Sequence, residues 1–386
     1  MTPRVAFFTD CFHEVNGVAL TSRQLDAFAQ RRGYPFFSFH IGPETKTWTE
    51  GQHTTMEIAR GQLLLRLDSD MFFDLDFLRY RTAMLDAVLG FRPDVVHITG
   101  PGDCGILGVI AARTLEVPLV ASWHTDLHKY AGRRLVQMLE FLPDGIKRQL
   151  DFGAEKGALA ATLQFYKLAK VTLAPNPDLV TLIEEGTGRP CHLMRRGIDS
   201  TIFSATRRTR AEGDPTVVLG YVGRLSPEKG IRLLADVEQA LIAAGVSNYR
   251  FLIVGQGGER EWLEQNLRQA DFAGVLRGEA LATAYANMDL FLFPSRTDTF
   301  GNVIQEALVS GVPAAVFAEG GPKFLVEPGE NGIRAETDAE FVEQIVRLVN
   351  DRGSLAALRA KVLASKLNRT WDGVFEDVYA AYRTAL

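Results

Sequence analysis

The stretch from residue 291 to residue 313 reads FLFPSRTDTFGNVIQEALVSGVP. Its apolar opening, closed by Pro294, predicts a buried parallel strand at its carboxyl end. A polar loop follows, and a helix is expected to begin at residues 300–302 and to end at Gly311. In open α/β sheets, ligands bind beyond the carboxyl ends of the strands, where helix N-termini offer free amides. The stretch therefore predicts an α/β fold with a ligand site at this corner.

Two acidic residues bracket the corner: Asp298 in the loop and Glu306 one turn into the expected helix. A carboxylate on the sheet side of a helix is costly unless something pairs with it. A ribose diol would pair with Glu306. The alternative is a generic strand-turn-helix in which Asp298 is solvated and Glu306 caps the helix.

With Phe300 and Gly301 between the acids and a Gly-Val-Pro exit, the stretch resembles the signature of the family 4 glycosyltransferases, retaining enzymes of the GT-B fold. That family carries two Glu eight positions apart; this chain keeps the spacing but has Asp298 in place of the first. The resemblance implies that Asp298 contacts sugar hydroxyls and that Glu306 binds the ribose. It also implies donor contacts where the helix begins: Phe300, Gly301, Asn302 and Val303.

A chain of 386 residues is too long for one ordinary core, so two domains are expected. The resemblance implies an α/β architecture of the GT-B type: two Rossmann-like domains whose parallel sheets face each other across a nucleotide-sugar cleft. We expect the N-terminal, acceptor-side domain to comprise residues 1–197 plus a returning helix in 368–386. The nucleotide-sugar-binding domain is expected at 198–367.

Bulk composition limits the function classes. A net charge of −5 gives no global electrostatic case for nucleic acid. Three widely spaced cysteines suggest no disulfide framework and fit a reducing compartment. No apolar stretch approaches the ~18 residues of a membrane span, and the first apolar run is too short for a signal peptide. We expect a cytoplasmic enzyme, with peripheral contact to the inner face of the cell membrane left open.

The first strand, expected at residues 5–9, leads into a turn at 10–25 and then a helix ending near Arg32. Asn16-Gly17 is a turn signal, and Gly17 allows a ligand to approach the backbone closely. In the resembled family this glycine faces the donor diphosphate and the transferred sugar. The alternative is a plain strand-to-helix connection. His13 and Glu14 stand in the same loop and are interpreted as solvated; contact with the sugar or the acceptor is the alternative.

The least informative region is 42–92. Residues 42–60 look polar and variable, and residues 61–80 are predicted to form a helix or loop on the acceptor side. Asp68-Ser69-Asp70 is literally an Asp-x-Asp sequence, which glycosyltransferases of the other major fold use to hold a divalent metal. The pattern is weak, and Asp74-Leu75-Asp76 repeats it, so we expect no metal there.

A strand expected at residues 119–122 places His124 at its carboxyl end, where α/β enzymes put their chemistry. The His-Thr-Asp sequence, with Tyr130 beyond it, resembles the lipid- and polyol-linked sugar transferases of the family. This implies that His124 lies beside the transferred sugar and the acceptor; a core or capping histidine is the alternative. Residues 132–170 are predicted to be helical and basic, either facing an anionic membrane surface or simply solvated.

The second half begins with a strand at residues 217–222 followed by GRLSPEKG. Ser226 is predicted to cap a helix whose mouth is flanked by Arg224 and Lys229, and such a mouth suits a diphosphate. In the resembled family the matching Arg and Lys hold the leaving diphosphate without metal. Two solvated cations are the alternative. The turn at Gly278 resembles the base-binding turn of the family.

These observations predict a retaining hexosyltransferase that moves a sugar from a nucleoside diphosphate sugar, with UDP or GDP as the nucleotide, to an acceptor hydroxyl. A lipid or a glycan is the candidate acceptor, and no metal or other cofactor is expected. The residues expected to take part in catalysis are His124, Asp298, Arg224 and Lys229. A non-catalytic nucleotide-sugar-binding protein of the same fold is the alternative, because the shorter Asp298 could have lost its contact.

Overall fold

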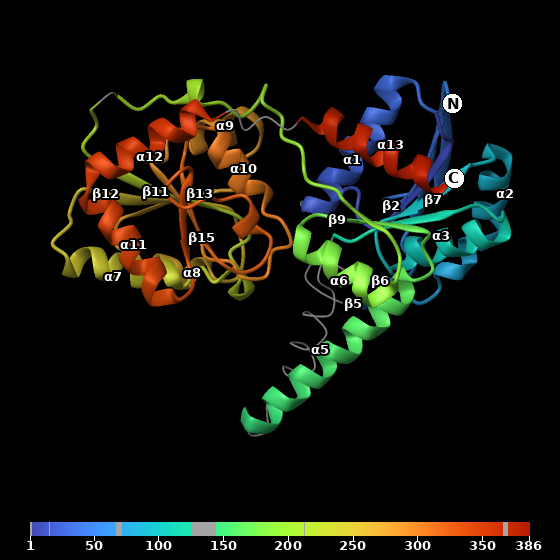
Figure 1. The fold of residues 1–386 in the computed structure, drawn as a ribbon, viewed down its shortest axis with the longest axis horizontal. Helices are drawn as coiled ribbons and strands as arrows, with labels where there is room; N and C mark the ends of the chain where they lie inside the picture. Colours follow the sequence, from blue (N-terminus) through green and yellow to red (C-terminus); the bar gives the residue numbers. More distant parts are fainter. Residues whose placement is uncertain (1, 15, 67–71, 125–143, 212, 366–369) are drawn as a thin grey trace. The chain divides into compact units, whose positions relative to one another are not determined.

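The computed structural model describes residues 2–14, 16–66, 72–124, 144–211, 213–365 and 370–386. The chain divides into two compact units (Figure 1). The N-terminal unit comprises Met1–Arg196 and Trp371–Leu386, and the C-terminal unit comprises Gly197–Thr370.

The N-terminal unit is built on an eight-stranded sheet of order β10-β9-β8-β7-β1-β2-β4-β3. Its strands are β1 (Val5–Thr9), β2 (Phe36–Gly42), β3 (Lys46–Glu50), β4 (His53–Ala59), β7 (Val95–Ile98), β8 (Leu119–Ser122), β9 (Val171–Ala174) and β10 (Cys191–Leu193). All neighbouring pairs are parallel except β3–β4. The α/β class with parallel sheets is therefore confirmed for this unit.

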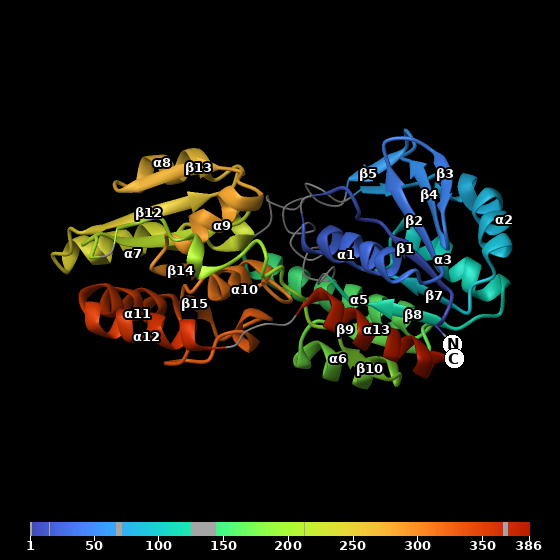
Figure 2. The same cartoon turned by 90° about the horizontal axis from the view of Figure 1, so that it is seen from above.

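Helices cover both faces of this sheet. The bounds are α1 (Gly17–Arg32), α2 (Arg81–Phe91), α3 (Asp103–Thr114), α5 (Asp144–Tyr166), α6 (Pro177–Thr187) and α13 (Trp371–Ala385). One core packs Ala6 and Phe8 of β1 against α2 and α3, and the other packs Val5 and Phe7 against α1 and α13. The returning helix α13 lies beside α1 (Figure 2), with the Phe28 and Phe375 rings 5.6 Å apart.

In this unit two expectations are wrong, and one pair of strands was not predicted. Residues 42–60 hold the hairpin β3–β4, which the sequence hides because β3 is an exposed edge strand and β4 is polar in composition although largely buried. The described residues within 61–80 form an antiparallel strand pair, β5 (Leu64–Arg66) and β6 (Phe72–Asp74), and a 3₁₀ helix at Phe77–Tyr80, where a helix or loop was expected. Helix α1 begins at Gly17, well before the expected end of the turn, because the Asn16 side chain accepts a hydrogen bond from the Ala19 amide at 2.9 Å.

The C-terminal unit contains a six-stranded parallel sheet of order β13-β12-β11-β14-β15-β16. Its strands are β11 (Val217–Val222), β12 (Tyr249–Val254), β13 (Ala270–Gly274), β14 (Leu290–Phe293), β15 (Ala314–Phe317) and β16 (Gly332–Ala335). Its helices are α7 (Leu233–Ala243), α8 (Arg260–Asn266), α9 (Gly278–Ala286), α10 (Asn302–Val309), α11 (Asp338–Asn350) and α12 (Arg352–Ala364).

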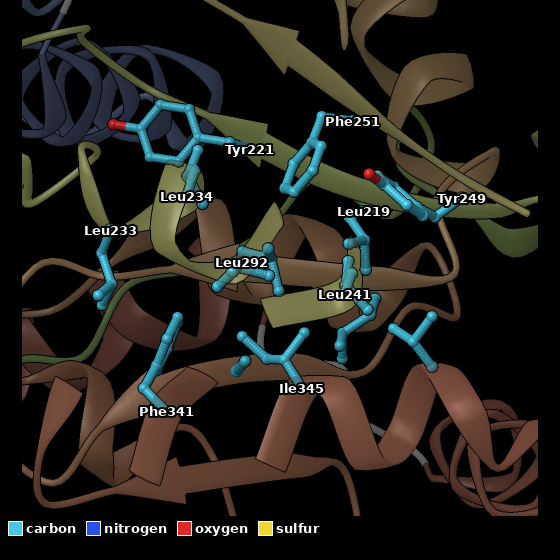
Figure 3. Close-up of a cluster of buried hydrophobic side chains, with 14 of the residues drawn as sticks. Leu219, Tyr221, Leu233, Leu234, Leu241, Tyr249, Phe251, Leu292, Phe341 and Ile345 are labelled. Atoms are coloured by element: carbon cyan, nitrogen blue, oxygen red, sulfur yellow. The ribbon is translucent and has the colours of Figure 1, made fainter. Parts of the chain in front are cut away.

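This sheet also lies between two helical layers. Figure 3 shows the first core, in which Leu219 of β11 and Leu292 of β14 meet Leu241 of α7 and Ile345 of α11. The opposite face of the sheet packs against α9 and α10. Each unit is thus a three-layer α/β/α structure, which holds the strand ends and the loops after them in fixed positions. Among the described helices, none has both the length and the apolar character that a bilayer span requires.

Candidate active site

The candidate site in the C-terminal unit forms where its sheet changes direction. Strands β12 and β13 follow β11 on one side, whereas β14, β15 and β16 extend on the other, so β11 and β14 are the topological switch point. Ligands of open α/β sheets bind at such points, outside the carboxyl ends of the strands. The loops after β11 and β14 are those that carry the predicted residues Lys229 and Asp298.

Lys229 and Asp298 form an ion pair across this switch point. The Lys229 ammonium lies 2.8 Å from one oxygen of the Asp298 carboxylate and 3.0 Å from the other. The two side chains are 19% and 22% exposed, so solvent and ligands can still reach the pair. The loops meet closely, because a Cβ on Gly230 would lie 2.5 Å from the Pro294 carbonyl oxygen. Sequence reasoning predicted separate partners for these residues and did not predict the pair.

Glu306 lies on α10 and accepts a hydrogen bond from the Tyr285 hydroxyl of α9 at 2.8 Å. The residue as a whole is only partly buried, but its carboxyl is surrounded by protein groups. This loss of hydration raises the pKa of Glu306 from the usual 4.5 to about 7, and the Tyr285 hydrogen bond opposes the rise. A ligand that donates hydrogen bonds to the carboxylate would bind its ionised form.

Helix α10 begins as expected directly after Gly301, which adopts a left-handed conformation with φ 99°. A Cβ there would lie 2.8 Å from Ile304 Cδ1, so glycine suits the turn on both counts. Phe300 is buried and Asn302 is the first residue of the helix. Val303 is only partly buried and packs against the core of this face.

The structure after Ser226 differs from the predicted helix N-terminus. Pro227–Lys229 forms a 3₁₀ helix of three residues, Ser226 makes no side-chain cap, and the α-helix begins only at Leu233. The Ser226 hydroxyl instead donates to the Glu228 carboxylate. The chain turns back after Lys229 through Gly230, which is left-handed with φ 65°. This turn, rather than a helix mouth, places the Lys229 ammonium beside Asp298.

The loop that carries Asp298 is supported by contacts with Gly320 and Gly321. The Gly321 amide donates to the Asp298 carbonyl at 2.8 Å. A Cβ on Gly321 would come within 1.9 Å of the Thr299 carbonyl oxygen, so only glycine allows this approach.

Two other predicted donor residues lie at the carboxyl edge of the same sheet. Arg224 follows β11 and is partly buried, and its carbonyl accepts a hydrogen bond from the Tyr221 hydroxyl at 2.8 Å. Gly278 opens α9 in a left-handed conformation with φ 55°. Both therefore occupy loops beyond strand ends, as a ligand-binding role requires.

The N-terminal unit has its own switch point between β1 and β7, and sequence reasoning overlooked the residue there. Asp10 directly follows β1, and its carboxylate accepts a hydrogen bond from the Cys104 amide at 2.7 Å. Burial is the main cause that raises the pKa of Asp10 to about 7; the Cys104 hydrogen bond opposes the rise, and the nearby Asp103 adds to it. The signal was available, since an Asp immediately after the first buried strand stands where α/β sheets place ligands.

His124 follows β8 as predicted, and both of its ring nitrogens are engaged. Arg196, a donor only, contacts Nδ1 at 2.9 Å, so Nε2 carries the proton and donates to Ser122 Oγ at 2.7 Å. Ser122 in turn contacts His97 Nε2 at 3.0 Å, and His97 Nδ1 contacts the Tyr382 hydroxyl at 2.7 Å. Burial is the main cause that lowers the pKa of His124 well below 6.5, so the ring is neutral. A sugar contact by this ring would share or replace one of these bonds.

Gly17, the remaining predicted donor residue, is the first residue of α1, and its carbonyl accepts a hydrogen bond from Thr21 Oγ1 at 2.8 Å. The Asp-x-Asp residues Asp68 and Asp70 and the predicted Tyr130 lie outside the described residues. Asp74 of the repeated Asp-x-Asp sequence is paired with Arg79 at 2.6 Å.

Comparison with known proteins agrees with this architecture. The profile described as "Glycosyltransferase Family 4" matches residues 15–202, and the profile described as "Glycosyl transferases group 1" matches residues 216–351. The chain is 33% identical to a GDP-mannose-dependent alpha-mannosyltransferase of Mycolicibacterium smegmatis, covering 99% of this chain and 98% of the relative. A protein of the same name from Mycobacterium tuberculosis is 32% identical over 98% of this chain and 96% of its own length.

Among solved structures, Anabaena HepE in complex with UDP and glucose superposes with a TM-score of 0.67 at 16% identity, with full coverage of both chains. This likeness confirms the predicted GT-B fold. The chain therefore belongs to the family 4 glycosyltransferases, GT-B enzymes that transfer a sugar from a nucleotide-sugar donor.

Proposed function

We propose that this enzyme transfers a mannosyl unit from GDP-mannose to an acceptor hydroxyl, with retention of the α configuration and without a metal ion at the diphosphate. The observation that carries the donor assignment is the similarity, over nearly the whole chain, to two relatives named GDP-mannose-dependent alpha-mannosyltransferase. The ion pair at the switch point supports the placement of the donor.

Lys229 is suited to bind the leaving diphosphate while it stays on Asp298. An ammonium has three donors, of which the Asp298 carboxylate takes two. The third can reach a phosphate oxygen, and Arg224, beyond the same strand, adds a second cation. Breaking the anomeric bond places negative charge on the diphosphate, so both cations stabilise the transition state more than the bound donor. This charge would otherwise need a metal.

Asp298 is assigned to the sugar hydroxyls and Glu306 to the ribose. The Glu306 carboxylate keeps acceptor capacity beyond its Tyr285 bond, and two ribose hydroxyls would use it. Gly278 is assigned to the base turn. The amides and side chains at 300–303 are assigned to the diphosphate and ribose, and Gly17 to the diphosphate and sugar. His124 is assigned to orienting the sugar and acceptor.

The transfer itself needs no covalent enzyme intermediate in this proposal. The bond between the anomeric carbon and the phosphate oxygen breaks, and the acceptor oxygen forms its bond on the same face of the sugar. The proton of the acceptor hydroxyl passes to an oxygen of the departing diphosphate. The part of this chain in the reaction is to hold the acceptor hydroxyl and the departing diphosphate on the same face of the sugar for that exchange.

The acceptor is proposed to be a lipid-linked or glycan hydroxyl reached from the cytoplasm, with peripheral contact to the inner membrane face. The hairpin β5–β6 supports a membrane contact, because Leu63, Leu64 and Leu65 are exposed by 64%, 40% and 52%. Cosedimentation with vesicles of phosphatidylglycerol and phosphatidylcholine tests this. Leu64→Asp should weaken vesicle binding, and equal binding by the variant would remove the hairpin from the proposal.

The donor assignment is tested with GDP-mannose, GDP-glucose and UDP-glucose. We expect GDP-mannose to raise the thermal midpoint most, since a ligand that binds only the folded state stabilises it. We also expect it to be cleaved to GDP fastest when candidate acceptor hydroxyls are present. A UDP-sugar that outperforms GDP-mannose in both measurements would overturn the donor assignment and leave the family unchanged.

A further inference from the structure

Two histidines and a glutamate converge at one edge of the N-terminal sheet. His40 of β2 and Glu57 of β4 are register partners on neighbouring parallel strands. His13 reaches the same place from the loop between β1 and α1. His13 Nε2 lies 3.3 Å and His40 Nε2 3.4 Å from the same Glu57 carboxylate oxygen, and one ligand atom from each residue fits within 4.8 Å of the others.

The Glu57 carboxylate is held in a built recess. Its side chain is 4% exposed, and its second oxygen, Oε1, accepts no hydrogen bond within the described part of the chain. Strand β2 leaves room for it with a glycine, because a Cβ on Gly42 would lie 2.0 Å from Glu57 Cδ. A buried carboxylate with an unsatisfied oxygen is costly unless a cation completes it. The recess therefore points to a ligand.

The surroundings of the two rings fit metal ligation. Ser38 Oγ lies 3.3 Å from His40 Nδ1 and can accept a hydrogen bond from its N–H, which leaves the lone pair of Nε2 for coordination. The Phe12 ring stacks on His40 with centroids 3.8 Å apart. The His13 side chain is 50% exposed, which provides a path from solvent.

One cation stands near the recess. Lys46 Nζ lies 3.9 Å from Glu57 Oε1, but it is bonded more closely to Glu44, at 2.8 Å, and its side chain is 45% exposed. Lys46 can therefore keep its ion pair with Glu44 while another cation binds the Glu57 carboxylate. The neighbouring His53 is engaged with Asp26 at 3.1 Å and does not compete.

We propose that His13, His40 and Glu57 bind a divalent transition-metal ion, with zinc the best fit. Ligand atoms held about 2.0–2.1 Å from a tetrahedral zinc ion lie roughly 3.3 Å apart. The observed separations of 3.3 and 3.4 Å match that spacing. Three protein ligands leave the fourth position to water on the exposed His13 side. The ion would fasten the loop before α1 to two strands of the sheet.

The proposed ligands His13, His40 and Glu57 are different residues from Arg224 and Lys229, which are assigned to the diphosphate charge, so the two proposals can be tested by different variants. The presence or absence of the zinc site also does not depend on which sugar the enzyme transfers. Failure of the donor assignment and failure of the zinc site are therefore distinguishable.

The experiment is to strip the full-length protein with a chelator, desalt it, and titrate it with zinc ion alone against a chromophoric competitor. We expect one zinc per wild-type chain. His13→Ala and Glu57→Gln should each weaken zinc binding at least tenfold. His192→Ala is the matched control, because His192 is another exposed histidine outside the cluster, on β10, and should leave binding unchanged. Zinc should also raise the thermal midpoint of the wild type and not that of Glu57→Gln.

Absence of stoichiometric zinc in the wild type, or equal affinity in wild type and His13→Ala, would overturn the proposal. His13 is half-exposed, so this variant is expected to fold even if a buried substitution does not. It therefore decides the question alone if Glu57→Gln fails to fold.

Discussion

The carboxyl edges of the two sheets handle polar groups in opposite ways. In the C-terminal unit, Lys229 and Asp298 pair across the switch point and remain about one-fifth exposed. In the N-terminal unit, Asp10 is enclosed and His124 is fixed in a buried chain that runs through Ser122 and His97. A partly exposed ion pair contributes at most about 1 kcal/mol and can accept a new partner. A buried network resists exchange. The difference suggests that the C-terminal unit stabilises the negative charge that develops on the diphosphate, and that the N-terminal unit positions the sugar.

The largest effect is expected at Asp298. Asp298→Ala should lower transfer by about 10³-fold or more, because the sugar loses a contact and the Lys229 ammonium loses the carboxylate that holds it. Asp298→Glu should keep nucleotide binding and change the ranking among donor sugars, since a site of paired polar groups discriminates by the hydroxyls it can reach. Transfer rates across several donors measure both effects.

Asp271→Ala is the matched control for Asp298. Asp271 pairs with Arg250 at 3.0 Å on the surface of the same unit, so its loss should leave transfer unchanged. Wild-type rates in Asp298→Ala with its best donor would contradict the assignment of Asp298 to the sugar.

Lys229 and Arg224 come next. Replacing either by Ala should lower kcat about 10²–10³-fold, since removing one contact to developing charge commonly costs about 2.7–4 kcal/mol. Turnover should suffer more than acceptor binding, because the charge grows toward the transition state. Steady-state kinetics measures the two effects. Lys361→Ala serves as control, because Lys361 pairs with Glu330 in the same unit. Less than a threefold change in both site variants would refute the roles.

In the C-terminal unit, the sequence predicted the secondary structure around Asp298 better than the contacts that Asp298 makes. The strand, the loop and the helix after Asp298 follow from apolar runs and from Gly and Pro, which are local signals. The Lys229–Asp298 ion pair could not be predicted from the sequence, because it joins residues 69 positions apart. The two loops that carry them approach closely only because residue 230 is glycine. Ser226 misled because a Ser-Pro pair opens a 3₁₀ turn as readily as a helix. Glu57 was missed because β4 looks polar until the packing of the sheet is known.

His124 sharpens the comparison from the other unit. His124→Ala should lower transfer by tenfold or more, up to about 10²-fold, since a small misplacement of a reacting group can cost that much. Nucleoside diphosphate affinity should stay nearly unchanged, because the predicted nucleotide contacts other than Gly17 lie in the C-terminal unit and His124 is not among them. Single-turnover rates and nucleotide titration measure these quantities separately.

Ser122→Ala distinguishes direct contact from positioning. This variant removes the hydrogen bond that His124 Nε2 donates to Ser122 Oγ but keeps the Arg196 contact with Nδ1. If both variants lose transfer equally, His124 acts through its fixed orientation. A matching loss of nucleotide affinity in His124→Ala would instead show a structural role, and the comparison between the units would fail.

Glu306 predicts a pH dependence of donor binding. Its pKa is about 7, and ribose hydroxyls donate to the ionised form. Nucleotide affinity should therefore fall roughly tenfold from pH 8 to pH 6, as the carboxylate takes up a proton that binding must displace. Calorimetric titration with GDP at both pH values measures this, and Glu306→Gln should be insensitive to pH in this range. An equal pH dependence in the variant would assign the titration elsewhere.

The same group should affect stability with the opposite sign. Because folding raises the pKa of Glu306 from 4.5 to about 7, its stabilising contribution is complete below pH 4.5 and is lost as pH rises through 7. Between pH 6 and pH 8 the free protein should lose about 1 kcal/mol relative to Glu306→Gln, by denaturant unfolding. Between pH 6 and pH 8, donor affinity thus rises while the free energy of unfolding of the ligand-free protein falls.

The smallest expected effect concerns metal ions. If Arg224 and Lys229 supply the charge at the diphosphate, transfer should change less than about threefold in excess chelator, with no stimulation by magnesium or manganese. Loss of activity that magnesium or manganese restores would contradict this, and it would make Asp68 and Asp70 candidate ligands. A different outcome is that chelator lowers transfer by the wild type, that only zinc restores it, and that chelator has no further effect on His13→Ala. That outcome would assign the effect to the histidine site of the N-terminal unit. The two outcomes separate an ion that takes part in the charge chemistry from one that only holds the loop before α1 in place.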